Sequence, residues 1–172
     1  MISNRSQNKN KLEIKNIVDE CFQDYKKTSM LISVSYCDWK CLNELNLSTD
    51  ICQNCKLAQS KSQVWEVEDL VRRYIDNPVN HAVIFGGLEP MWDFIPILNF
   101  IHILRTTYNN LDDVVIYTGY YEDEIQEQLV TLSQYRNIIV KFGRYNPNLE
   151  SRYDNVLQVT LASNNQYAVK IS

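Results

Sequence analysis

Cys37-Asp-Trp-Lys-Cys41 and Cys52-Gln-Asn-Cys55 hold four of the five cysteines of this chain within nineteen residues. The first segment begins where the apolar run 30–36 ends, and that run reads as a strand. A strand with a cysteine-rich loop at its carboxyl end presents that loop where open α/β sheets bind ligands. Thiolates at such spacing hold either zinc or an iron–sulfur cluster. The sequence therefore predicts a metal site, with its metal left open.

The composition is that of an ordinary globular protein. The chain has 172 residues, of which 45% are hydrophobic and 22% charged, enough for one domain with a sizeable core. The formal net charge of −4 argues against general nucleic-acid binding, which favours a basic surface. We therefore expect no nucleic-acid partner.

The distribution of apolar residues indicates a reducing compartment. Residues 1–11 are polar and are expected to form a flexible leader, without the apolar core of a secretory signal. No apolar run approaches the roughly 18 residues of a membrane span, so we expect a cytoplasmic protein with no membrane partner. Clustered cysteines there are more often metal ligands than disulfides. Cys21 stands apart and is expected to be a small, half-buried apolar residue.

Hydrophobic periodicity predicts an α/β domain over residues 12–172. Expected strands cover 12–18, 30–36, 82–85, 113–117 and 137–142, and expected helices cover 64–75, 94–104 and 122–132. Residues 19–29 fit either a loop or a short helix. The alternation of strand and helix favours a mostly parallel sheet with right-handed crossovers.

The four glycines share one feature, which is that each lies just after a predicted strand. They are Gly86, Gly87, Gly119 and Gly143. In a parallel sheet these strand ends meet at one edge, where glycine allows the backbone to approach a ligand. Tight βα turns are the simpler explanation of each glycine alone. Together with the cysteines, the set favours a binding site.

Two metal centres fit the cysteines. Zinc would take all four thiolates; the spacing of Cys52 and Cys55 is usual for zinc, whereas that of Cys37 and Cys41 is less typical. A structural zinc usually stabilises a small domain without its own core, and this loop adjoins a large sheet. An iron–sulfur cluster held by three cysteines would leave one iron open to a substrate.

Several segments, in order, resemble one family. Ser33–Cys41 together with Cys52–Asn54 resembles the cluster loop of radical S-adenosylmethionine (SAM) enzymes, in particular the activating component of anaerobic (class III) ribonucleotide reductase. Four further segments resemble motifs of the same family, and the resemblance spans residues 12 to about 171. They are Phe85–Pro90, Ile116–Tyr120, Val140–Tyr145 and Leu161–Gln166. The departures are eight extra residues before Cys52 and the insertion of Leu88. In addition, residues 19–29 replace the family's glycine- and arginine-containing turn, and Lys141 stands near where the family has an aspartate.

The resemblance implies an incomplete (βα)6 partial barrel with a [4Fe–4S] cluster and SAM as cofactors. It implies Cys37, Cys41 and Cys52 as metal ligands and catalytic residues, with Cys55 as the alternate ligand. The implied SAM-binding residues are Gly86, Gly87, Glu89, Pro90 and Thr118, with Asn54 beside the cluster. The alternative interpretation of Glu89 is a solvated carboxylate in a turn. The alternative interpretation of Asn54 is a side chain that caps the following turn. The resemblance also allows Lys141 to contact the ribose or carboxylate of SAM, but the favoured expectation for it is an exposed charge.

The reaction that the resemblance implies is reductive cleavage of SAM, followed by formation of a glycyl radical on a large partner, the anaerobic ribonucleotide reductase. The electron donor would be a protein such as flavodoxin or ferredoxin. Two other hypotheses remain: a radical SAM enzyme acting on another peptide or a small molecule, and a non-catalytic zinc or iron–sulfur interaction module.

Overall fold

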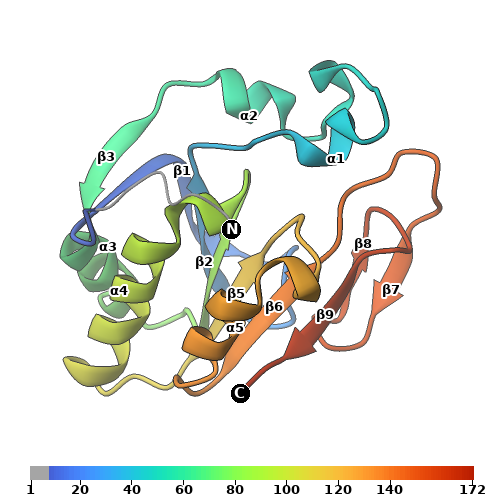
Figure 1. The fold of residues 1–172 in the computed structure, drawn as a ribbon. Helices are drawn as coiled ribbons and strands as arrows, with labels where there is room; N and C mark the ends of the chain where they lie inside the picture. The colour runs from blue at the N-terminus through green and yellow to red at the C-terminus, as the bar shows by residue number, and fades with distance from the viewer. Residues whose placement is uncertain (1–7) are drawn as a thin grey trace.

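A mixed seven-stranded sheet is the centre of the computed structural model, which describes residues 8–172 (Figure 1). In spatial order its strands are β3 (Gln63–Glu66), β1 (Lys11–Cys21), β2 (Ser29–Val34), β4 (Ala82–Gly86), β5 (Asp113–Tyr117), β6 (Ile138–Phe142) and β9 (Tyr167–Lys170). The four strands β2, β4, β5 and β6 are parallel, whereas β1, β3 and β9 pair antiparallel at the two sides. The expectation of a mostly parallel sheet therefore describes the centre only.

Three helices cover one face of this sheet: α3 (Val67–Ile75), α4 (Phe94–Thr106) and α5 (Gln126–Leu132) (Figure 1). Their apolar faces and alternate residues of β4, β5 and β6 form the larger core cluster. All residues of β4 and β6 are buried, as expected for strands covered on both faces. Apart from β3, the predicted alternation of strands and helices from residue 30 to residue 142 is confirmed.

The opposite face of the sheet is covered by chain from the C-terminal part. The hairpin of β7 (Arg152–Asp154) and β8 (Val159–Leu161) lies there, at the right of Figure 1. Leu157 and Leu161 join Tyr25 and sheet residues in a second, smaller core cluster. A backbone hydrogen bond from the Lys26 N–H to the Leu157 carbonyl (2.9 Å) connects the β7–β8 turn to residues 22–28.

Two elements differ from the sequence-based prediction. The helix expected from residue 64 begins at Val67, because Gln63–Glu66 forms a strand whose Trp65 pairs with Leu12 of β1. Val64 matched the helical period, yet its side chain is exposed. Residues 19–21 extend β1 beyond its expected end at 18, and residues 22–28 form a loop with bends at 23–27, which was one of the two alternatives expected for 19–29. At β3, pairing with a strand distant in sequence outweighed the local pattern.

The expected leader, residues 1–11, lies mostly outside the described residues, and β1 begins at its last residue. Among residues 8–172, the longest helices are too short or too polar to cross a lipid bilayer.

Asp154 holds the hairpin against the sheet. Its buried carboxylate accepts backbone N–H bonds from Val156 (2.9 Å), Leu157 (2.9 Å) and Ala168 (3.0 Å). Asp154→Ala should lower the free energy of unfolding by about 3 kcal/mol, because it leaves these donors without an acceptor. Urea denaturation measures this. The exposed Glu150→Ala is the matched control, and equal midpoints for the two variants would contradict the assignment.

Candidate functional site

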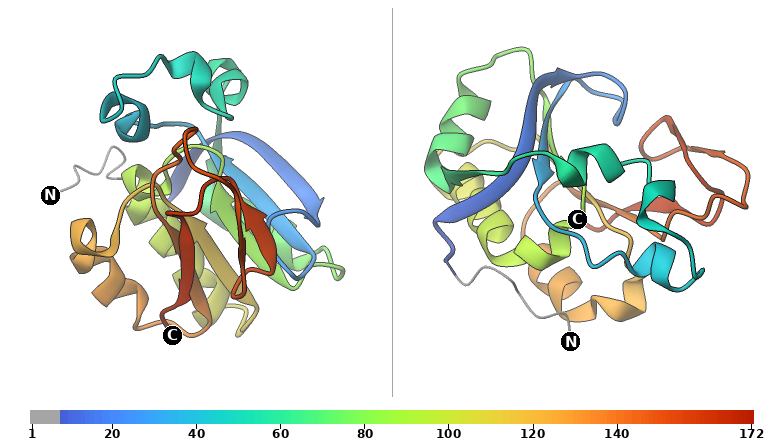
Figure 2. Two further views of the ribbon diagram at one scale, coloured as in Figure 1. Left: turned by 90° about the vertical axis from the view of Figure 1, so that its right-hand side faces the viewer. Right: turned by 90° about the horizontal axis from the view of Figure 1, so that it is seen from above.

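A cavity of about 390 Å³ lies at the carboxyl ends of the parallel strands. Cys37, Cys41 and Cys52 line it, and Cys55 does not. The cysteine-rich segment that supplies them contains α1 (Lys40–Asn43), the short 3-10 turn η1 (Thr49–Ile51) and α2 (Cys55–Gln59), and it crosses over this end of the sheet (Figure 2). All predicted ligands except the alternate one therefore share a single cavity.

Local backbone geometry directs N–H groups at two of the thiols. Trp39 adopts a left-handed conformation (φ 58°) just before α1, and its N–H lies 3.3 Å from the Cys37 Sγ. The N–H of Asn54 lies 3.3 Å from the Cys52 Sγ. Hydrogen bonds to sulfur favour the thiolate and tune the potential of a bound cluster. The chain therefore provides donors for charged sulfur at both ends of the loop.

Burial favours the neutral form of the three cavity thiols when no metal is bound. All five cysteines are free, and burial raises the pKa of Cys37, Cys41 and Cys52, with a further rise from neighbouring acidic groups or thiols. A coordinated metal deprotonates such thiols outright, so their burial does not oppose ligation. Residues 8–172 contain no group of three His, Cys, Asp or Glu side chains arranged around a single metal ion.

Glu89 is a buried acceptor at the same edge. Its carboxylate accepts hydrogen bonds from the Thr118 hydroxyl (2.7 Å), the Gly119 N–H (2.8 Å) and the Met91 N–H (3.1 Å). Burial raises the pKa of Glu89 to about 7, although these hydrogen bonds oppose the rise. A solvated turn carboxylate, the alternative for this residue, is therefore wrong. Glu89 ties the end of β4 to the end of β5.

The glycine pair and Asn54 meet across the cavity. Gly86, the last residue of β4, and Gly87 after it line the cavity, and Gly87 has φ 78°. The Asn54 amide donates to the Gly87 carbonyl (2.5 Å), and it makes no side-chain cap on α2. The turn-cap alternative for Asn54 is therefore wrong, because this side chain joins the cysteine loop to the glycine turn. Pro90 is buried and begins the 3-10 turn η2 (Pro90–Asp93).

Lys141 contradicts its predicted exposure. The side chain is 6% exposed, lines the cavity and donates from Nζ to the Gly143 carbonyl (3.0 Å). Burial lowers its pKa to about 8, while nearby Glu89 acts in the opposite direction. Lys141 lies on β6 beside Tyr117 of β5 and so enters the site from the sheet. The hydrophobic periodicity of the sequence could not predict the burial of Lys141. Every residue of β6 is buried, so no alternation along this strand separates inward from outward side chains.

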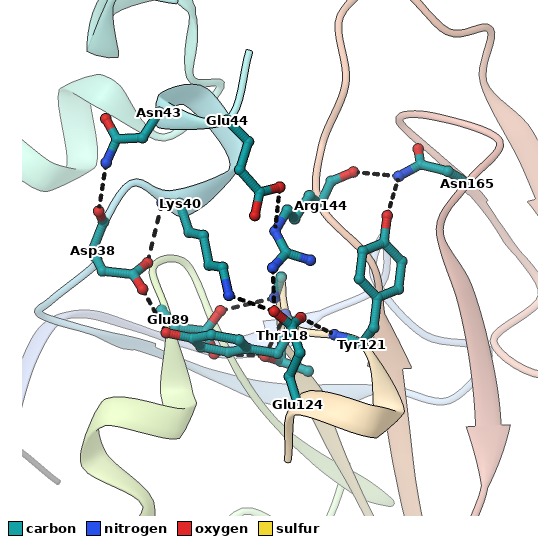
Figure 3. Close-up of polar contacts among 12 residues, drawn as sticks. Asp38, Lys40, Asn43, Glu44, Glu89, Thr118, Tyr121, Glu124, Arg144 and Asn165 are labelled. Atoms are coloured by element: carbon teal, nitrogen blue, oxygen red, sulfur yellow. Dashed lines mark hydrogen bonds and ion pairs between the residues drawn. The ribbon is translucent and has the colours of Figure 1, made fainter. Parts of the chain in front are cut away.

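A network of ion pairs holds the cysteine loop in place (Figure 3). Glu124 of the 3-10 turn η3 (Glu122–Glu124) pairs with Lys40 of the loop and with Arg144 (2.5 Å) after β6. Arg144 also reaches Glu44 of the loop (2.9 Å). In the sequence, Glu124 falls in the expected helix 122–132 and Arg144 in the segment Val140–Tyr145, but neither pattern gave a signal for their contact with the loop.

Glu124 should make stability depend on pH. Burial alone would raise its pKa, but hydrogen bonds from Arg144 and Lys40 outweigh burial and lower it to about 2 from 4.5. A lowered pKa stabilises the folded state above about pH 4.5, and this contribution is lost as pH falls toward 2. Urea midpoints of the wild type and Glu124→Gln should differ most near neutral pH and converge on acidification.

The exposed Asp123→Asn is the control for that experiment. A Glu124→Gln difference that stayed constant from neutral to acidic pH would exclude the charge of Glu124 as its cause.

Comparison with known proteins gives one match. A family model described as a 4Fe-4S single cluster domain matches residues 12–168. Neither the curated proteins nor the solved structures contain a significant match.

Proposed function

Because the chain belongs to the family of 4Fe-4S single cluster domains, we propose that its cluster cleaves SAM reductively and that the product generates a glycyl radical on a partner anaerobic ribonucleotide reductase. The proposed ligands are Cys37, Cys41 and Cys52. The four parallel strands with helices on one face support part of an incomplete (βα)6 barrel, whereas the antiparallel β1, β3 and β9 depart from it. We also propose the cytoplasm as its compartment and flavodoxin or ferredoxin as electron donor.

The position of the cysteines carries this proposal. Three thiols line one cavity while the fourth, Cys55, stays outside it. A [4Fe–4S] cluster held by three thiolates keeps one iron open to a substrate, whereas a structural zinc is closed by four ligands. Backbone donors to the Cys37 and Cys52 sulfurs suit thiolates bound to a cluster.

When bound, the cluster supplies the electron that breaks the sulfur–carbon bond of SAM. The residues around it supply position and charge. Glu89 carries a carboxylate into the cavity and is suited to accept from the SAM ammonium, and Thr118 orients that carboxylate. Lys141 brings a buried cation suited to the SAM carboxylate. The Gly87 carbonyl is occupied by Asn54, so a contact with the ammonium requires Asn54 to share or release it.

The experiment is anaerobic reconstitution with iron and sulfide, followed by incubation with SAM, a reductant and purified anaerobic reductase. We expect release of 5′-deoxyadenosine and a glycyl radical doublet in the electron paramagnetic resonance spectrum of the reductase. Cys37→Ala should abolish both signals. Release of 5′-deoxyadenosine without a doublet on an active reductase would refute this partner and favour another peptide or a small molecule. If a protein with a full cluster gave neither 5′-deoxyadenosine nor the doublet, the radical chemistry would be refuted.

A further inference from the structure

β8 is a strand with a free edge beside the candidate site. Within residues 8–172 it pairs with β7 alone, in a two-stranded sheet separate from the main one. All three residues of β8, and Ala162 after it, line the cavity that holds the three cysteines. No residue of β7 lines that cavity. The strand nearer the site is thus the one whose second edge has no strand partner.

The cavity runs along the edge of β8 rather than across one of its faces. Val159 and Leu161 share a face and pack on the second core cluster, whereas Thr160 points the opposite way and is exposed. Successive side chains of a strand alternate between faces, so a cavity that touches all of them borders the strand edge. β7 occupies the other edge, which leaves the free N–H and C=O groups on the cavity side.

We propose that this edge docks an extended segment of the partner protein, which adds to β7 and β8 as a third strand. This rests on the proposed function and names how its substrate is held. A row of alternating N–H and C=O groups is matched by an extended polypeptide backbone, and strand addition is a recurrent mode of peptide recognition. The edge from Val159 to Ala162 accommodates roughly four residues, about 14 Å of extended chain.

The direction of β8 leads the docked segment to the cysteines. The N-terminal end of β8 adjoins the β7–β8 turn, whose Leu157 carbonyl accepts a hydrogen bond from the Lys26 N–H near the start of β2. Its last end leads into Gln166, whose amide donates to the Gly143 carbonyl (3.3 Å) after β6. The thiols lie at that same carboxyl end of the sheet. A segment paired with β8 therefore presents main-chain atoms at the end of the cavity where the cluster is proposed.

The part of the cavity that the sheet forms next to β8 is apolar. Leu31 of β2, Ile84 of β4 and Tyr117 of β5 face the same cavity from the sheet. Main-chain pairing to β8 requires no particular side chain at the reacting position, and glycine presents its Cα without one. The edge therefore suits a substrate whose reacting atom belongs to the backbone.

Amide hydrogen exchange of the reconstituted protein tests this docking. Exchange at residues 159–162 is measured alone, with purified anaerobic reductase, and with a synthetic peptide that copies the glycine-bearing segment of that reductase. We expect exchange there to slow by about tenfold or more with either probe, because the free N–H groups gain acceptors. The turn residues 155–158 are the internal control, since they should change little.

The result is independent of catalysis. Slower exchange at 159–162 supports the docking edge with or without a glycyl radical doublet, whereas a missing doublet on an active reductase refutes only the partner's role as glycyl radical substrate. Unchanged exchange at these residues, with saturating reductase that does acquire the doublet, overturns the docking edge and leaves the proposed function standing. Unchanged exchange with no doublet overturns both.

Proline substitutions provide a second test. Successive N–H groups of a strand point to opposite edges, so Val159→Pro and Thr160→Pro remove donors from different edges of β8. One variant should break pairing with β7 and lower the urea midpoint. The other should fold as the wild type does and bind the peptide at least about tenfold more weakly. If the normally folded variant bound the peptide as tightly as the wild type, the docking edge would be wrong.

Discussion

Cys52→Ala is expected to lose the cluster, whereas Cys55→Ala is expected to keep it. Cys52 lines the cavity with Cys37 and Cys41 and receives the Asn54 N–H, while Cys55 begins α2 outside the cavity. After anaerobic reconstitution, Cys55→Ala should hold about four irons and four sulfides per chain, like the wild type. Cys52→Ala should hold few of either and lose the brown absorbance, as should Cys37→Ala and Cys41→Ala.

The two substitutions form a matched pair, because both remove one half-buried thiol from the same loop. Circular dichroism of the cluster-free proteins should show the same fold for both. Loss of the cluster in Cys55→Ala with retention in Cys52→Ala would reverse the ligand assignment. Loss in all four variants would indicate four thiolate ligands and so contradict the open iron.

Gly87→Ala should destabilise the protein strongly, whereas Gly86→Ala should be mild. A Cβ at Gly87 would lie 2.7 Å from the Ser33 Cβ, and its φ of 78° disfavours any side chain. A Cβ at Gly86 would meet Tyr117 at an ordinary 3.4 Å. We expect Gly87→Ala to lower the free energy of unfolding by about 2–3 kcal/mol, from strain and from the contact with β2.

Urea denaturation of the cluster-free protein measures that difference without reference to activity. The same substitution should distort the glycine turn that lines the cavity, so cluster-loaded Gly87→Ala should also bind SAM more weakly. Equal urea midpoints for the two alanine variants would contradict the account of this turn.

The parallel centre of the fold was predictable because its strands are mostly apolar. β4 and β6 are buried over their whole length, and Pro78 ends the α3 segment within a few residues of where the pattern predicts. β3 was not predictable in this way. Its four residues carry too short a pattern, and only pairing with β1 distinguishes it from the first turn of α3.

The sequence predicted those site residues that directly follow a strand. Glu89 and Thr118 were placed by their neighbours in sequence, and their hydrogen bond (2.7 Å) joins the two strand ends. The contacts made by Arg144 and Asn54 depend on the path that the segment between Cys41 and Cys52 takes over the sheet. No local sequence pattern predicts that path. The burial of Lys141 follows from its central strand rather than from its charge.

The proposed chemistry requires a cluster iron that the three cysteines leave open. The direct measurement is the electron paramagnetic resonance spectrum of the reduced, reconstituted protein before and after addition of SAM. We predict the signal of one reduced [4Fe–4S] cluster per chain and a clear change in that signal when SAM is added, since SAM would bind the open iron. A colourless protein with one tightly bound zinc, or a cluster signal unchanged by saturating SAM, would contradict the account.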